Sequence, residues 1–239
     1  MSLDTLTARI AALDWPALEA SIDAASYARV PEVLDADTCR ALAASYDDAS
    51  VGFRSTVQMA RHHYGRGEYR YFAYPLPATV ATMRTAFYPP LAAIANRWRY
   101  RLGEAGLWPG TLDELTRQCH AAGQTRPTPL LLSYGVGDYN CLHQDVYGDL
   151  LFPLQIIVLL SRPGREFDGG ELVLTEQRPR RQSRPVVVPV DQGDAVIVPV
   201  RHRPEPGARG YRRVAVRHGV STVRAGARKT LGLIFHDAA

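Results

Sequence analysis

The second half of this chain is a series of short apolar runs separated by turns rich in glycine and aspartate. One run, 152–160, is almost continuously apolar, as expected of a strand that is covered on both faces. Short strands at such close spacing predict an antiparallel sandwich or jelly roll. Strands are expected at 129–134, 139–145, 152–160, 171–175, 185–190, 195–200, 214–223 and 228–235, with turns at 135–138, 167–170 and 191–194.

The first 125 or so residues are predicted to be mainly helical. Helices are expected at 3–13, after Asp14, from Asp35 or Asp37 to Tyr46, at 77–101 with an interruption at Pro89-Pro90, and at 111–122. A length of 239 residues is enough for one β domain with an added helical part. We therefore expect a single α+β domain over 1–239, with helical support and a recognition flap in 1–125 and the core in 126–239.

The residue types and spacing around His143 indicate a metal site. On a β-strand, residues i and i+2 point to the same side, so His143 and Asp145 can chelate one ion while Gln144 faces away. With His218 far downstream, they form the ligand set of a two-His-one-carboxylate triad, which holds non-haem Fe(II) and leaves one face open. The alternative is that His143 and Asp145 form an ordinary surface pair.

His202 and His236 compete with His218 as the third ligand. We prefer His218 because Arg228 follows it by ten residues on the last expected strand, whereas His202 lies in a loop rich in arginine and proline and His236 lies close to the end of the sequence. On the last expected strand, Arg228 shares its face with small or apolar groups, namely Thr230, Gly232 and Ile234. That setting suits a buried cation awaiting an anion, although Arg228 could also be a surface residue beside Lys229.

At about 129–237 the chain resembles the Fe(II)/2-oxoglutarate dioxygenase superfamily, on its prolyl-hydroxylase-like and AlkB-like side. The resemblance rests on an ordered set of motifs and covers slightly under half of the chain. It implies a double-stranded β-helix (jelly-roll) core with N-terminal buttressing helices, and the use of Fe(II), 2-oxoglutarate and O2. The matching motifs are His143-x-Asp145, an apolar strand, Asp168-Gly169-Gly170-Glu171-Leu172, His218-Gly219-Val220, Gly226-x-Arg228 and a final apolar strand.

The resemblance also implies roles for single residues. His143, Asp145 and His218 are the expected iron ligands, and Arg228 is expected to grip the far carboxylate of 2-oxoglutarate with its planar fork. Thr230, two residues on, shares that strand face and can donate a hydroxyl. These assignments make the protein a dioxygenase in which the metal and co-substrate do the oxidising chemistry and the chain positions and shields it.

Two further pocket residues are less specific. Tyr134 lies where AlkB-like enzymes have a tyrosine that binds the co-substrate, but it can equally be a packing residue. Two residues earlier this chain has Leu132 where those enzymes have an asparagine, which argues against close identity with AlkB. Gln155 interrupts an apolar run, and a buried polar group needs a partner. It is expected either to line the pocket or to bond to a neighbouring backbone group.

The segment 53–74 combines arginines, histidines and aromatic residues around two glycines. It is interpreted as a recognition flap over the site, in which aromatics such as Tyr64 stack on a flat ring and arginines meet phosphates. Arg61, Arg66 and Arg70 are the candidates for those contacts. The alternative is a two-stranded structural flap with packed tyrosines and solvated arginines.

The charge distribution favours a polyanionic partner. The net charge is +4, and between Arg162 and Lys229 there are 15 basic and 7 acidic residues, which gives +8. The surplus lies in arginine-rich loops at 178–181, 201–203 and 212–213. The alternative is a genome of high GC content, since the chain has one lysine against 27 arginines.

The sequence predicts a cytoplasmic protein. No stretch is long and apolar enough to span a membrane, and the N-terminus lacks a basic segment followed by an apolar core. The three cysteines, Cys39, Cys119 and Cys141, show no regular spacing and leave at least one unpaired, which fits a reducing compartment.

Three functions are compatible with these features. The leading hypothesis is oxidative demethylation of alkylated bases, a form of DNA repair, with single-stranded or damaged DNA or RNA as partner. The second is hydroxylation of a protein side chain, such as proline, or of a small metabolite, which the 168–172 motif favours. The third is a sensor that uses the fold without catalysis; the intact triad and Arg228 argue against it.

Overall fold

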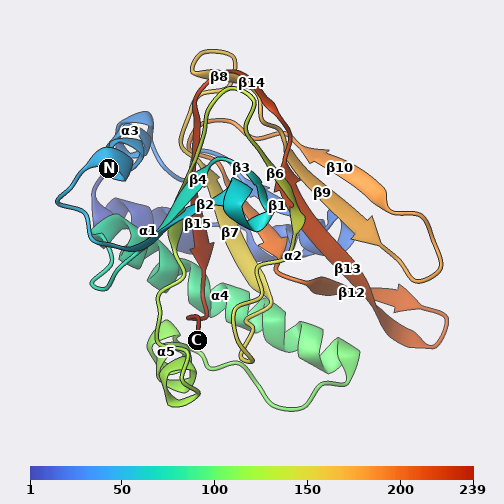
Figure 1. Ribbon diagram of the computed structural model, residues 1–239. Coiled ribbons are helices and arrows are strands. Elements are labelled where there is room, and N and C mark those ends of the chain that lie inside the picture. The colour runs from blue at the N-terminus through green and yellow to red at the C-terminus, as the bar shows by residue number, and fades with distance from the viewer.

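Two antiparallel sheets form the walls of a jelly roll in the computed structural model, which describes residues 1–239 (Figure 1). The larger sheet has seven strands in the order β1-β11-β7-β15-β5-β4-β2. The interleaved order, with neighbours far apart in sequence, is what a double-stranded β-helix requires, so the predicted fold is confirmed. The strands are β1 (Ala28–Val30), β2 (Phe53–Gln58), β4 (Glu68–Phe72), β5 (Leu130–Tyr134), β7 (Leu154–Leu159), β11 (Ala195–Pro199) and β15 (Arg228–Ile234).

The smaller sheet lies opposite and carries two of the three predicted metal ligands. Its strands run in the order β10-β9-β13-β6-β3, and β12 pairs with the outer half of β13. A separate two-stranded ladder joins β8 and β14. The strands are β3 (Gly65–Arg66), β6 (Tyr139–His143), β8 (Phe167–Gly169), β9 (Leu172–Gln177), β10 (Arg184–Val188), β12 (His202–Gly207), β13 (Gly210–Val220) and β14 (Val223–Gly226).

Five helices cover the outer face of the larger sheet. Four of them begin at a side chain that accepts a hydrogen bond from the first turn, supplied by Ser2, Asp14, Asp35 and Thr111. One hydrophobic cluster joins the long helix α4 to the sheet, because Phe87, Leu91 and Ile94 pack with alternate residues of β7 and β15. The helices are α1 (Leu3–Ala11), α2 (Trp15–Ala25), α3 (Ala36–Ala44), α4 (Ala78–Leu102) and α5 (Leu112–Ala121), with short 3-10 turns η1 (Ser45–Asp47) and η2 (Met59–His62).

The first half of the chain differs from the prediction in two ways. Helix α4 continues through Pro89 and Pro90 without the expected interruption. Proline removes a helical hydrogen bond and crowds the preceding turn, but the buried residues on either side, Tyr88 and Leu91, hold the helix against the sheet. In addition, β2, β3 and β4 are part of the sheets, so the division at about residue 125 does not separate helices from strands.

Strand β15 forms a wall shared by the core and the site. Thr230 pairs with Leu159 on one side and Leu132 on the other, and Arg228 pairs with Tyr134. Because side chains alternate along a strand, Arg228, Thr230, Gly232 and Ile234 face the space between the sheets. Leu231, Leu233 and Phe235 face the helices and belong to their hydrophobic cluster.

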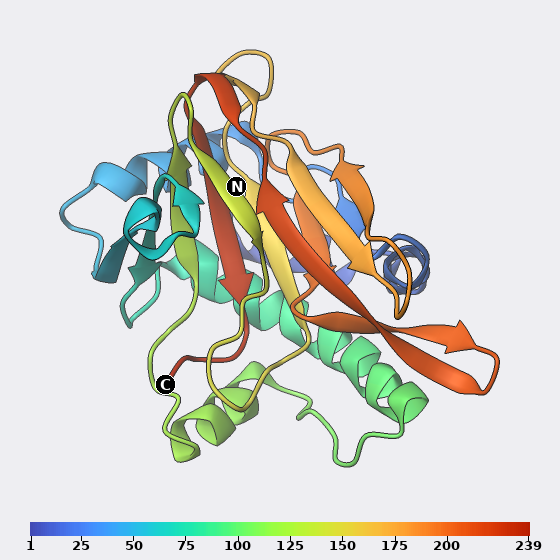
Figure 2. The same ribbon diagram turned by 45° about the vertical axis from the view of Figure 1, so that its right-hand side comes forward.

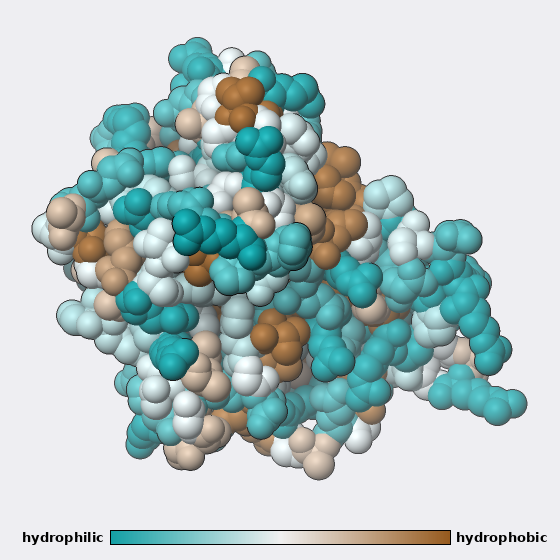
Figure 3. All heavy atoms as spheres, in the orientation of Figure 1, coloured by the Kyte–Doolittle hydropathy of each residue, from teal (hydrophilic) through white to brown (hydrophobic).

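Two long hairpins extend beyond the jelly roll. Strands β12 and β13 project away from the body on the right of Figures 1 and 2, and the β9–β10 hairpin lies beside them. The projecting end is hydrophilic in Figure 3. None of the helices combines the length and apolar character needed to cross a bilayer. The three cysteines are free, with Cys141 exposed.

Candidate functional site

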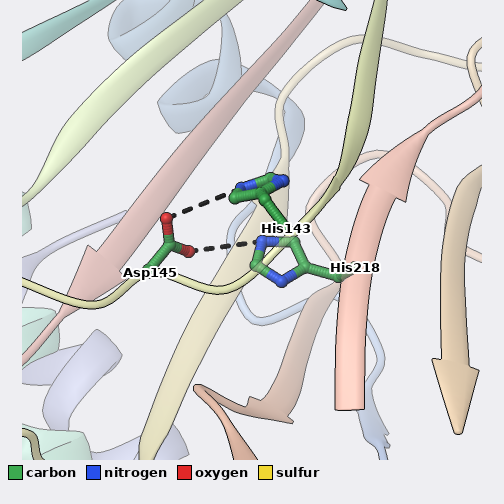
Figure 4. A group of neighbouring side chains, drawn as sticks. All are labelled: His143, Asp145 and His218. Atoms are coloured by element: carbon green, nitrogen blue, oxygen red, sulfur yellow. Dashed lines mark ion pairs between the residues drawn. The ribbon is translucent and has the colours of Figure 1, made fainter. Parts of the chain in front are cut away.

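The three predicted ligands meet at the opening of the jelly roll (Figure 4). One potential ligand atom from each of His143, Asp145 and His218 lies within 4.8 Å of the others. The Asp145 carboxylate is central, with Oδ1 at 3.5 Å from His143 Nε2 and Oδ2 at 3.3 Å from His218 Nε2. The two imidazoles are brought together by direct pairing of His143 with His218 across β6 and β13.

The backbone route to this cluster differs from the prediction at Asp145. Strand β6 ends at His143, so Asp145 lies in the irregular segment that follows and not on the same strand. Gln144 still points away, since its amide donates to the carbonyl oxygens of Arg201 and Val216. These bonds tie the segment to the base of the β12–β13 hairpin and turn Asp145 toward the histidines.

The histidines have the chemistry of metal ligands. Nδ1 of His143 lies 2.7 Å from the carbonyl oxygen of Cys141, so this nitrogen donates and Nε2 is left as an acceptor. Burial lowers the pKa of His218, and the adjacent His143 lowers it further, which favours the neutral ring. Burial alone would raise the pKa of Asp145, but its contacts with His143 and His218 hold that pKa well below its usual range.

Arg228 stands at the inner end of the site with unsatisfied donors. Its side chain is 3% exposed, and neither Nε nor Nη1 has a hydrogen-bond partner. Burial lowers the pKa of this guanidinium to about 10, which still leaves it charged at neutral pH. The rings of Tyr134 and Phe167 lie 5.6 and 6.0 Å from its Cζ. A buried cation with free donors and no carboxylate partner fits an anionic ligand.

A cavity of about 250 Å³ connects Arg228 to the triad. Tyr134 and Thr230 line it, as the sequence predicted, and Thr230 is almost completely buried. Gln155 also faces the cavity, 2% exposed, and its Nε2 has no partner. Of the two readings of Gln155, lining the pocket is therefore the one that the geometry supports. The nitrogen and oxygen atoms of the triad fit Fe(II), and the unpaired donors of Arg228 fit a carboxylate of a dicarboxylate ligand.

The expected recognition residues lie in different places. Tyr64 lines the mouth of the cavity, is 50% exposed and stacks on His62 with centroids 5.4 Å apart. Arg61 in η2 and Arg66 in β3 are exposed on either side of Tyr64 in sequence, outside the cavity, and Arg66 lies 3.8 Å from Asp138. Arg70 is a correction: its Nε donates to Glu68 and its guanidinium lies 4.3 Å from the Tyr46 ring. Strands β2 and β4 are built into the larger sheet, which turns Arg70 away from the site.

Several residues near the site were not found by sequence reasoning. Asn140 lines the cavity and donates to the Tyr134 hydroxyl at 3.3 Å. Tyr147 also lines it and donates to Asp145 Oδ1 at 2.9 Å. Tyr69 lines the wall nearest these rings. The only available signal was the position of Tyr147 two residues after Asp145; the others depend on long-range pairing.

The basic hairpins carry less free charge than the sequence suggested. Four of their arginines are paired with glutamates: Arg178, Arg203 and Arg212 with Glu176 or Glu205, and Arg213 with Glu104. The remaining six have no acidic partner and are exposed, namely Arg180, Arg181, Arg184, Arg201, Arg209 and Arg217.

Comparisons with solved structures bear on the fold. A 2-oxoglutarate-Fe(II) oxygenase family oxidoreductase from Burkholderia pseudomallei superposes with a TM-score of 0.55 at 16% identity, covering 95% of this chain and 94% of that one. A prolyl-4-hydroxylase from Pseudomonas putida gives a TM-score of 0.54, also at 16% identity, and covers 94% and 99%. Both structures therefore share the fold of this chain.

Sequence comparisons identify the family. An uncharacterized protein of Mycobacterium tuberculosis (strain CDC 1551 / Oshkosh) is 48% identical over 168 residues, which cover 70% of this chain and 72% of the relative. Residues 67–238 match the family model Oxygenase-NA, described as an oxygenase "catalysing oxidative methylation of damaged DNA". The match spans the elements from β4 to β15 and includes every residue that lines the cavity except Tyr64. This chain therefore belongs to the Oxygenase-NA family.

Proposed function

We propose that this oxygenase demethylates alkylated bases in DNA or RNA by oxidation, with His143, Asp145 and His218 as iron ligands. The observation that carries the proposal is the cavity that joins this triad to the orphaned Arg228 guanidinium. Bound Fe(II), with 2-oxoglutarate and O2, would supply the oxidising power that hydroxylates a methyl group, releasing succinate, carbon dioxide and then formaldehyde.

The chain's own residues bind and orient the reactants. Arg228 offers Nε and Nη1 to the far carboxylate of 2-oxoglutarate, and Thr230 adds a hydroxyl from the next cavity-facing position on β15. The hydroxyl of Tyr134 is held by Asn140 at the same end. Apolar side chains such as Ile157 and Leu172 line the remaining wall and exclude water.

The mouth of the cavity suits a flat, charged polymer. Tyr64, stacked on His62, offers an exposed aromatic face, and the exposed Arg61 and Arg66 flank it in η2 and β3. The unpaired arginines of the β9–β10 and β12–β13 hairpins add positive charge that attracts phosphates. The damaged DNA named in the family description agrees with this chemistry. A base must leave the stack to reach the triad, so single strands are the favoured substrate.

The test is succinate and formaldehyde release by Fe(II)-loaded protein, with 2-oxoglutarate and O2, in the presence of methylated or unmethylated single-stranded DNA. Stimulation by methylated DNA with formaldehyde release supports the proposal. Turnover at the same rate with and without DNA would support the oxygenase activity and indicate a peptide side chain or a metabolite as the substrate. No turnover in protein shown to hold iron would point to a sensor.

Two sets of variants locate the chemistry. His143→Ala or Asp145→Ala is expected to abolish turnover, and full activity in either variant would contradict the ligand assignment. Tyr64→Ala is expected to weaken DNA binding by roughly 1–3 kcal/mol, the usual contribution of a stacked base. Tyr100→Ala is the matched control, because Tyr100 is 88% exposed on α4 and does not line the cavity.

A further inference from the structure

Asp145 is held differently from the two histidines beside it. His143 and His218 sit on paired strands, so the sheet fixes both. Asp145 lies beyond the end of β6, and only one backbone hydrogen bond, from Val146 to Gln144, closes the chain around it. Its carboxylate therefore depends on side-chain contacts for its orientation.

The hydroxyl of Tyr147 supplies such a contact. It donates to Asp145 Oδ1 at 2.9 Å, and it accepts a hydrogen bond of 2.9 Å from the hydroxyl of Tyr71. The two bonds form a short chain, Tyr71 to Tyr147 to Asp145, that ends on the carboxylate. A donor on Oδ1 restricts rotation of the carboxylate and leaves Oδ2 next to His218.

Tyr71 is a rigid anchor for this chain. It lies in β4, paired with Leu130 of β5, and its side chain is 6% exposed. The guanidinium of Arg54 covers its ring at 4.2 Å and is itself fixed by a bond to the carbonyl oxygen of Pro127. The larger sheet is thereby linked through Tyr147 to the Asp145 carboxylate, which lies beyond the end of β6.

We propose that Tyr147 is a positioning residue for Asp145 and that Tyr71 acts through Tyr147. The inference rests on the proposed metal site. Hydrogen bonds to a ligating carboxylate fix its orientation, and their removal typically weakens metal binding about 10- to 100-fold. The ring of Tyr147 also packs against Tyr71 and His236, at 6.1 and 6.3 Å between centroids, so the hydroxyl must be separated from the ring in the test.

Tyr147→Phe and Tyr71→Phe keep the rings and remove the hydroxyls. The probe is Co(II) alone, added to metal-free protein and followed by its visible absorption, which depends on the geometry of the ligands. Tyr147→Phe is expected to bind Co(II) about 10- to 100-fold more weakly and to change the spectrum. Tyr71→Phe is expected to show a smaller loss, and the double variant to bind no more weakly than Tyr147→Phe.

Tyr74→Phe is the matched control, because the Tyr74 hydroxyl also donates to a buried carboxylate, that of Asp237, and neither residue lines the cavity. It is expected to lower the melting temperature and to leave Co(II) affinity unchanged. Wild-type affinity and spectrum in Tyr147→Phe would overturn the positioning role alone, and additive losses in the double variant would overturn the role of Tyr71. Absence of Co(II) binding in the wild type would overturn the metal site itself.

Discussion

Two buried arginines, one on a strand of each sheet, show opposite uses of the same side chain. Arg203 on β12 is 1% exposed and donates to Ser26, to Glu176 and to the carbonyl oxygen of Pro204. Arg228 on β15 is 3% exposed, and two of its nitrogens have no partner. A buried charge is tolerated when it is paired. The donors of Arg203 are therefore satisfied within the fold, whereas two donors of Arg228 are left for the proposed ligand.

The largest effect is expected on stability, when Arg203 is replaced. Arg203→Met leaves Glu176 buried without its main partner, so the free energy of unfolding should fall by about 3–5 kcal/mol. Urea denaturation at neutral pH measures this. Replacing Glu176 by Met in the same protein should recover part of the loss, because the uncompensated charge is removed. An Arg203→Met protein as stable as the wild type would contradict the structural role.

Arg228→Met should affect ligand binding and not stability. Binding of 2-oxoglutarate to the metal-loaded protein is expected to weaken by about 2–5 kcal/mol, or roughly 30- to several thousand-fold, as calorimetry without O2 would show. Stability of the ligand-free protein should stay the same or rise, because an unpaired buried charge is lost. Arg217→Met, at an exposed arginine without an acidic partner, is the control. A large drop in the stability of Arg228→Met would show that Arg228, like Arg203, has a structural role.

Acid should weaken the ion-pair network that includes Arg203, Glu176 and Glu205. Hydrogen bonds from Arg178 and Arg212 lower the pKa of Glu205 to about 2, and bonds from Ser26 and Arg203 lower that of Glu176 despite its burial. Both carboxylates stabilise the fold while ionised. That stabilisation is present above their ordinary pKa of 4.5 and is lost as the pH falls toward 2. Denaturation midpoints should decline over this range, and less steeply in Glu205→Gln.

The smallest effect is expected from Thr230→Val. The change keeps the shape of the side chain and removes one neutral donor, so 2-oxoglutarate binding should weaken by about 0.5–1.5 kcal/mol. The same calorimetric titration detects it. Thr175→Val on β9, outside the cavity, should bind normally. Unchanged binding in Thr230→Val would limit the carboxylate contacts to Arg228.

The strands and the main site residues could be predicted because they depend on local pattern. Alternation of side chains placed Arg228 and Thr230 on one face, and the apolar run containing Gln155 marked a strand covered on both sides. The spacing of His143, His218 and Arg228 located the cluster without knowledge of the topology. The roles assigned to these residues, and a single domain over 1–239, remain proposals.

What could not be predicted depends on contacts between distant segments. The sequence does not show that Arg70 donates to the backbone of Tyr46, or that Glu205 pairs with Arg178 and Arg212. A count of charged residues therefore overestimates the positive charge that is free to bind a partner. The link from Tyr71 to Tyr147 joins residues that are 76 positions apart. Only the arrangement of strands in space brings such partners together.

The alternation along β15 has a consequence for how this protein can change. Residues that shape the site and residues that fill the helical core follow one another on the same seven-residue strand. Insertion or deletion of one residue there would exchange the two sets, placing Arg228 against α4 and leucines in the cavity. New specificity is therefore more accessible through substitution of exposed side chains at the mouth of the cavity, such as Tyr64, than through a change in the length of β15.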